Sequence, residues 1–209
     1  MEPLLLTLEK LAVERARGSG PAHDHLHIRR VAKTAGLLAD DERADREVAI
    51  AAALLHELWS FPKDHPDKAS SGQVCAEHAR VVLRGLGCEA GFVDRVAYAI
   101  AVHPFSRGVV PETLEARILQ DADRLDALGA IGIARCFATC SEMRVPFYAE
   151  VDPFCVARAP DEKGSGVGHF YQKLLRVPAT LHTTTAKRLA DERVEFLRRY
   201  LEQLAREIE

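Results

Sequence analysis

Apolar residues recur at intervals of three and four along most of this chain, and no segment alternates apolar with polar residues as a half-buried strand would. Such spacing gathers apolar side chains on one face of a helix. The pattern therefore predicts an all-α protein. The expected helices cover residues 3–17, about 22–39, 45–55, 70–86, 91–102, 111–139 with interruption at Gly129 and Gly132, 169–176, and about 183 to the end.

The segment from Val48 to Leu55 is apolar on every side, which is typical of a helix enclosed within a core. Asp45 is placed to cap this helix at its start. It ends in two adjacent polar residues, His56 and Glu57, followed by a loop with two prolines. Neighbouring residues inside a helix point about 100° apart, so they do not normally serve one another. At a helix end, the backbone can turn both toward one target.

Pro111 is well placed as a first-turn proline, because it lacks the N–H that a helix leaves unpaired there. Glu112 and Glu115 then add negative charge where the helix dipole favours it. The longest irregular stretch covers residues 145–168, and no clean linker or internal repeat divides the chain. We therefore expect a single domain.

The 209 residues carry a net charge of −3, with 47% hydrophobic and 28% charged residues, as in ordinary soluble globular proteins. There is no overall basic field to attract nucleic acid. The N-terminal leucines have an acidic flank, unlike a signal peptide, and no apolar stretch approaches the ~20 residues of a membrane span. We expect a soluble cytoplasmic protein with neither nucleic acid nor membrane as a partner. Nothing in the sequence decides between a monomer and a homodimer.

The five cysteines are an odd number without a CxxC pair, which argues against a disulfide framework and for a reducing compartment. Cys136 and Cys140 are spaced to share one helix face. Apolar packing explains that spacing better than metal or redox chemistry does.

Residues with metal-binding side chains gather at three places: "HDHLHIRRV", the His56–Glu57 pair, and "QDADRLDALGAIGIAR". Carboxylates in an apolar helix need a cation or donors nearby. Arg124 is one candidate cation. The alternative is that imidazoles and carboxylates from different helices hold a divalent metal ion and leave positions open for water.

The order His27, His56–Glu57, Asp123 resembles the HD-domain metal-dependent phosphohydrolases, and within them the small bacterial branch typified by YedJ and YpgQ. The stretches that carry the resemblance span residues 23–200. They are "HDHLHIRRV", "AALLHELWSFPKDHPDKASS", "HPFSRGVVPETLEARILQDADRLDALGAIGIAR" and "GHFYQKLLRVPATLHTTTAKRLADERVEFL". The resemblance implies one HD-type domain over residues 1–209, with core motifs at 23–135 and a C-terminal helical part at 165–209.

The resemblance further implies a buried site for one divalent ion (Mn, Mg, Co, Ni or Fe), held by His27, His56, Glu57 and Asp123. This chain departs from the family at one ligand, because the family's second motif is His-Asp. A glutamate carboxylate reaches about 1.5 Å further and needs a different rotamer to bind the same ion. Glu57 is either a ligand that has adapted or a change that weakens metal binding.

Asp126 follows Asp123 by three residues and is predicted to be catalytic, orienting water or accepting its proton. Two other roles remain open for Asp126: support of His27, or an ion pair with Arg30. Asp121 is expected to face elsewhere as a structural carboxylate.

Phosphate oxygens need compensating donors, and three residues are predicted to supply them. Lys63 follows the His56–Glu57 pair and is assigned both a catalytic and a substrate-binding role. His103 is assigned the same two roles, as a phosphate or proton donor. Arg30 is assigned to substrate binding.

The resemblance implies hydrolysis of a nucleoside or deoxynucleoside triphosphate to a monophosphate and pyrophosphate. One alternative is a phosphomonoesterase acting on nucleoside monophosphates. Another, motivated by Glu57, is a nucleotide- or metal-binding module with weak or lost turnover. A helical nucleic-acid binder is disfavoured, because the basic residues are dispersed and the net charge is negative.

Overall fold

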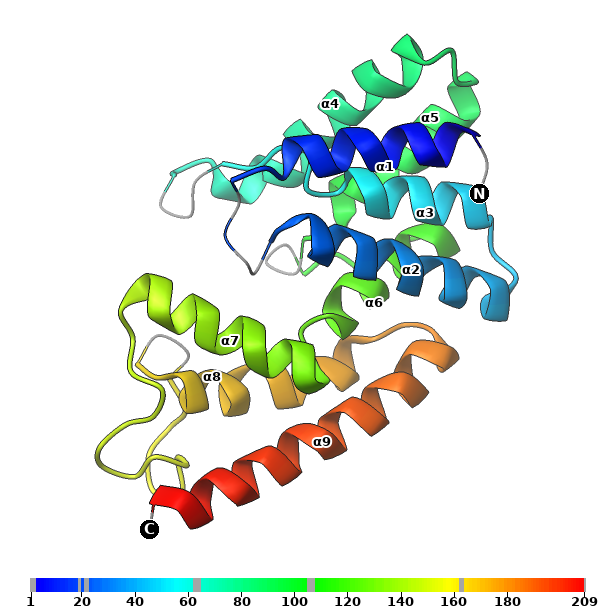
Figure 1. Ribbon diagram of the computed structural model, residues 1–209. Helices are drawn as coiled ribbons and strands as arrows, with labels where there is room; N and C mark the ends of the chain where they lie inside the picture. Colours follow the sequence, from blue (N-terminus) through cyan, green and yellow to red (C-terminus); the bar gives the residue numbers. More distant parts are fainter. Residues whose placement is uncertain are drawn as a thin grey trace. The chain divides into compact units, whose positions relative to one another are not determined.

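The computed structural model describes residues 3–18, 20, 23–61, 65–104, 108–161 and 164–208, and all regular secondary structure in these ranges is helical. The all-α prediction is confirmed. The chain folds into two compact units, Met1–Asp123 and Arg124–Glu209 (Figure 1). The prediction of one HD-type domain over residues 1–209 stays a prediction. None of the described helices is both long and apolar enough to cross a lipid bilayer.

The first unit is built from helices in its described part. They are α1 (Pro3–Arg15), α2 (His25–Glu42), α3 (Arg46–Leu55), the short 3-10 helix η1 (Lys68–Ser70), α4 (Ser71–Gly85), α5 (Ala90–Val102) and most of α6 (Leu114–Leu125).

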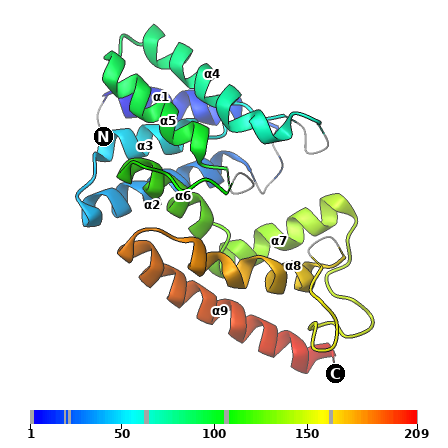
Figure 2. The same ribbon diagram turned by 180° about the vertical axis from the view of Figure 1, so that it is seen from behind.

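Helix α3 is the centre of this unit. It packs against α1, α2 and α5, and both views of the molecule show it running between α1 and α2 (Figures 1 and 2). Every residue from Val48 to Leu55 is buried, so the prediction of an enclosed helix is confirmed. Burial of all its faces fixes the position of the residues that follow it, and these are His56 and Glu57.

Side-chain caps define where the two helices nearest the site begin. Asp24 precedes α2, and its carboxylate accepts a hydrogen bond from the backbone N–H of His27 at 2.9 Å. Asp45 precedes α3 and accepts from Glu47 N and Val48 N, as the sequence predicted. A cap of this kind satisfies backbone donors that a helix otherwise leaves unpaired at its start.

Helix α6 is tied to the rest of the first unit by polar side chains. Gln120, which is buried, donates from Nε2 to the carbonyl oxygens of Val102 (2.8 Å) and Val109 (3.0 Å). Glu115 accepts a hydrogen bond from Asp45 N at 3.1 Å. These bonds hold α6 against the end of α5 and the start of α3.

The second unit contains α7 (Gly129–Met143), α8 (Gly166–Gln172), the 3-10 helix η3 (Leu174–Thr180) and α9 (Thr184–Ile208). Helix α9 packs on α7 and η3, and α8 packs on α7. The chain between α7 and α8 is irregular in its described part, as the Pro- and Gly-rich sequence predicted.

The helix expected over residues 111–139, with interruption at Gly129 and Gly132, is divided into α6 and α7 by a turn after Leu125. The break falls just before Gly129, whose φ of +68° a glycine adopts without strain, whereas Gly132 lies inside α7. The first-turn position predicted for Pro111 was wrong. Pro111 lies outside α6, which begins at Leu114. The hydroxyl of Thr113 accepts from Ala116 N at 3.3 Å and takes the capping position instead.

Candidate metal centre

His27, His56 and Asp123 come from α2, the end of α3 and α6, and their side chains meet in the first unit. Each offers one donor atom, and these atoms all lie within 4.8 Å of one another. Nε2 of His27 is 3.3 Å from Nε2 of His56 and 3.6 Å from Oδ1 of Asp123. Both imidazoles are almost fully buried, whereas the Asp123 side chain is 30% exposed. Solvent therefore reaches this group from the side of Asp123.

The orientation of His56 follows from its place at the C-terminal end of α3. Its Nδ1 lies 2.6 Å from the carbonyl oxygen of Ala53, three residues back. A carbonyl only accepts, so Nδ1 carries the proton and Nε2 presents a lone pair toward His27. Metal-bound histidines commonly use this arrangement, in which the second ring nitrogen donates to a backbone carbonyl.

The spacing of these donors fits a divalent ion. Two ligands bound at about 2.1 Å from one ion, at tetrahedral or octahedral angles, lie roughly 3.0–3.4 Å apart. The 3.3 Å between the two Nε2 atoms falls within that range, and the 3.6 Å from His27 Nε2 to Asp123 Oδ1 lies just above it. Imidazole nitrogen with carboxylate oxygen suits Mn²⁺, Fe²⁺, Co²⁺, Ni²⁺ or Zn²⁺, and does not choose among them.

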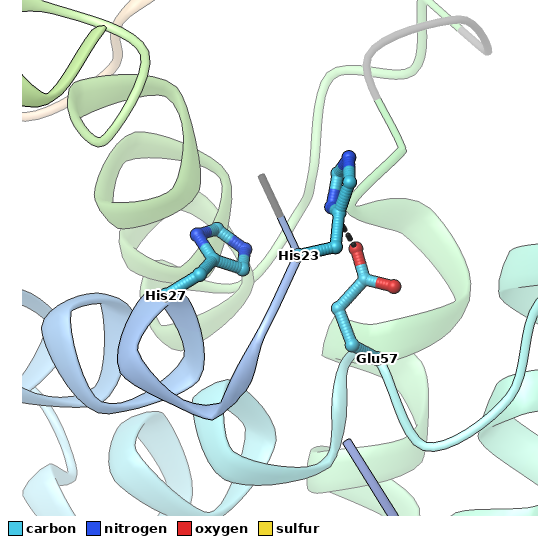
Figure 3. A group of neighbouring side chains, drawn as sticks. All are labelled: His23, His27 and Glu57. Carbon is cyan, nitrogen blue, oxygen red and sulfur yellow. Dashed lines mark ion pairs between the residues drawn. The ribbon is translucent and has the colours of Figure 1, made fainter. Parts of the chain in front are cut away.

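Glu57 joins a second group of donors that shares His27. Donor atoms of His23, His27 and Glu57 also lie within 4.8 Å of one another. Nδ1 of His23 is 3.3 Å from Oε1 of Glu57, and Figure 3 shows the two side chains pointing toward each other beside His27. The adjacent residues His56 and Glu57 thus both reach the neighbourhood of His27, each within its own group.

Glu57 is held as a carboxylate. Burial alone would raise its pKa, but the hydrogen bond from His23 and the field of the neighbouring imidazoles whenever they are protonated, His56 first, hold the pKa well below its usual value. The side chain is still 26% exposed. A charged, partly exposed carboxylate at this position suits a cation that arrives from solvent.

His103 repeats the geometry of His56 at the end of α5. Its Nδ1 donates to the carbonyl of Ile100, again three residues back, at 2.6 Å. The rings of His103 and His56 are 5.3 Å apart between centroids and perpendicular. Burial lowers the pKa of His103 most, and the neighbouring His56 lowers it further, so the neutral form is favoured. Its Nε2 then accepts hydrogen bonds.

The other predicted residues that the structure describes belong to neither donor group. Asp126 lies in the turn after α6 rather than on that helix, and its buried carboxylate pairs with Arg135 at 2.9 Å. Arg30 lies on α2, one turn after His27, and is half-buried. Asp121 is fully buried on α6. Lys63 lies outside the residues that the structure describes.

Two contacts at the site were not predicted from the sequence. His23 pairs with Glu57, and spacing along the chain could not reveal that pairing. Cys75 on α4 donates its thiol to the carbonyl oxygens of Leu55 and His56, both at 3.3 Å. It thereby satisfies acceptors left at the end of α3.

Comparison with known proteins places this geometry in a family. The model of the HD domain matches residues 25–128, which include both donor groups except His23. YpgQ of Bacillus subtilis is 35% identical over 190 residues, covering 89% of this chain and 84% of YpgQ. The crystal structure of that protein in complex with ADP has a TM-score of 0.76 and 32% identity, covering 97% of this chain and 94% of YpgQ. An HD-superfamily hydrolase from Bacillus thuringiensis has a TM-score of 0.76 and 29% identity, covering 98% and 96%.

The chain therefore belongs to the HD domain family and is a metal-dependent phosphohydrolase of that superfamily. Its similarity to YpgQ extends through both compact units, well beyond the segment that the HD domain itself matches.

Proposed function

We propose that this protein hydrolyses nucleoside or deoxynucleoside triphosphates to monophosphates and pyrophosphate, with one divalent ion at His27, His56, Glu57 and Asp123. The observation that carries the proposal is the convergence of His27, His56 and Asp123, whose donor atoms lie at distances suited to ligands of one ion. The complex of YpgQ with ADP, a protein 32% identical in structure-based comparison, supports a nucleotide as the substrate.

When bound, a divalent ion lowers the pKa of a coordinated water and offsets the charge of the substrate phosphates. The protein's part is to hold the donors in position. His56 is fixed by Ala53, and Asp123 is held on α6 by the bonds of Gln120 to the end of α5. Burial of the two imidazoles keeps water from competing for their nitrogens.

His103 is proposed to act on the substrate. Its neutral ring presents Nε2 as an acceptor suited to take a proton from water, and its protonated ring would donate to a phosphate oxygen. Arg30 and Lys63 are proposed to bind phosphate, as cations that follow His27 and Glu57 in sequence.

Asp126 is the weakest of the proposed catalytic residues. Its carboxylate is already engaged by Arg135 at 2.9 Å, and an oxygen that accepts from arginine is less available to orient water. An arginine pair was among the roles left open by the sequence, although Arg30 was the partner considered there.

The test is a screen of the metal-stripped protein against nucleoside tri-, di- and monophosphates with Mn²⁺, Mg²⁺, Co²⁺ and Ni²⁺. Release of pyrophosphate from triphosphates, lost in His56→Ala, is the expected result. Orthophosphate from monophosphates alone would identify a phosphomonoesterase instead. Nucleotide binding without release of either product under any ion would leave the binding module, which the Glu57 departure motivates, as the correct function.

A further inference from the structure

Glu57 stands where the family has an aspartate, and its longer side chain ends beside an imidazole from another part of the chain. Oε1 lies 3.3 Å from Nδ1 of His23, within a group of donor atoms that also includes His27. Figure 3 shows the dashed pairing between His23 and Glu57. The extra methylene adds a rotatable bond, and ordering that bond on a metal ion costs conformational entropy unless something else holds it.

His23 is itself held in place by the start of α2. Its backbone N–H donates to the carbonyl of Gly20 at 3.0 Å, and the next residue, Asp24, is the extended N-cap that binds His27 N. The His23 and His27 rings lie 5.6 Å apart in an edge-to-face arrangement. The cap therefore sets the position of His23 relative to the imidazole that both donor groups share.

We propose that His23 is a positioning residue for the metal centre, which binds one oxygen of Glu57 and so orients this carboxylate toward the ion. This inference rests on the proposed function, because it takes Glu57 as a ligand. The pairing compensates for the longer acid: one oxygen is fixed by the imidazole and the other is left for the cation.

A purely structural ion pair makes a different prediction. The His23 side chain is 51% exposed, and exposed pairs of this kind contribute little to folding stability. If His23 only pairs with Glu57 on the surface, its removal changes neither stability nor metal affinity. If it positions the carboxylate, its removal weakens metal binding while the metal-free protein melts unchanged.

A double-mutant cycle on metal affinity separates these cases. Mn²⁺ binding to the metal-stripped full-length protein is measured by chelator competition for the wild type, His23→Ala, Glu57→Asp and the double variant. We expect His23→Ala to weaken binding about 10-fold, as loss of a group that orients a ligand does. In the Glu57→Asp background the shorter acid binds as in the family's His-Asp motif. There, His23→Ala should weaken Mn²⁺ binding by about 2-fold or less.

Two further variants define the interaction. In His23→Asn the amide nitrogen occupies nearly the position of Nδ1 and still donates, so most of the affinity should be retained. His25→Ala is the matched control, since His25 lies in the same segment at the first residue of α2 and in neither donor group. Its Mn²⁺ affinity should equal that of the wild type.

If His23→Ala weakens Mn²⁺ binding equally in both backgrounds, His23 acts independently of Glu57 and the inference is overturned. The inference is also overturned if His23→Ala weakens binding in neither background. Glu57→Ala distinguishes this failure from that of the proposed function. If Glu57→Ala leaves Mn²⁺ affinity unchanged, Glu57 is no ligand, and its place in the metal site fails together with the role of His23, whereas hydrolysis at His27, His56 and Asp123 is tested by the product screen. If it weakens affinity while His23→Ala does not, only the role of His23 is rejected.

Discussion

The Nε2 atoms of His27 and His56 face each other at 3.3 Å, at the start of one helix and the end of another. A cation between them stabilises the folded protein, because the unfolded chain does not hold this arrangement. At a free concentration 100 times the Kd, an ion that binds only the folded state adds about 2.7 kcal/mol.

We therefore expect Mn²⁺ to raise the melting temperature of the wild type and not that of His27→Ala or His56→Ala. Thermal unfolding with and without chelator measures this. His78→Ala is the control, because His78 is exposed and belongs to neither donor group. A metal-dependent shift that survives both substitutions would contradict the ligand assignment.

His103 should affect turnover without affecting metal binding, because its ring lies beside His56 but outside both donor groups. We expect His103→Ala to lower kcat for the preferred nucleotide by about 100-fold, the lower range for loss of an acid–base group. Its Mn²⁺ affinity should remain within about threefold of the wild type, since no ligand is removed. Comparison with His103→Gln is informative: a glutamine that restores activity would indicate donation to phosphate, because an amide cannot accept a proton from water.

The five thiols should differ in reactivity. Cys75, Cys136 and Cys140 are buried, and burial raises the pKa of Cys75 to about 11 and that of Cys136 to about 12. The thiolate is the reactive form, so these cysteines should react slowly with Ellman's reagent at pH 8. Cys88 and Cys155 are partly exposed.

Titration of the native protein should thus show two fast thiols, and titration in denaturant should show all five. Cys88→Ser and Cys155→Ser are expected to remove one fast thiol each. A third fast thiol in the native protein would mean that a buried cysteine is accessible.

Asp45 makes the free energy of unfolding depend on pH, and the direction of this dependence follows from its lowered pKa. Burial alone would raise its pKa, but hydrogen bonds from Val48 N and Arg95 hold it below the ordinary 3.8. A carboxylate with a lowered pKa stabilises the fold above its unfolded pKa, and this contribution is lost as the pH falls below about 4.

Asp45→Asn keeps a capping oxygen and removes the charge that pairs with Arg95 at 2.8 Å. At pH 7 we expect a loss of less than about 1 kcal/mol of unfolding free energy, as for a partly exposed pair. Urea unfolding between pH 7 and pH 3 should show the difference from the wild type shrinking only in the acid range. If the difference in unfolding free energy between the wild type and Asp45→Asn grows on acidification, the role assigned to the Asp45 charge is wrong.

Sequence patterns predicted the helices well where their ends are chemically marked. Asp45 and the apolar run to Leu55 defined α3 correctly, because a capping carboxylate and complete burial both leave a local signature. The break between α6 and α7 was predicted at Gly129 and Gly132, and the structure has it only before Gly129. A glycine marks a permitted turn, but the packing that uses it is not local.

For the site, the sequence named His27, His56 and Asp123 together, and the structure brings their donor atoms within one group. It could not show that Glu57 faces His23, because these residues are 34 positions apart and belong to different segments. Nor could it show that Asp126 falls just past the end of α6, where it pairs with Arg135. Both depend on tertiary contacts rather than on periodicity.

His56 and His103 each end a helix and each donate Nδ1 to the carbonyl three residues before them. One residue inserted within α3 or α5 would rotate the following imidazole by about 100° relative to the helices packed around it, and so turn it away from its neighbouring histidine. Chain-length variation among relatives is therefore expected in the connecting loops and excluded from these two helices. In designing chimaeras, α3 and α5 should be exchanged whole, each together with its terminal histidine.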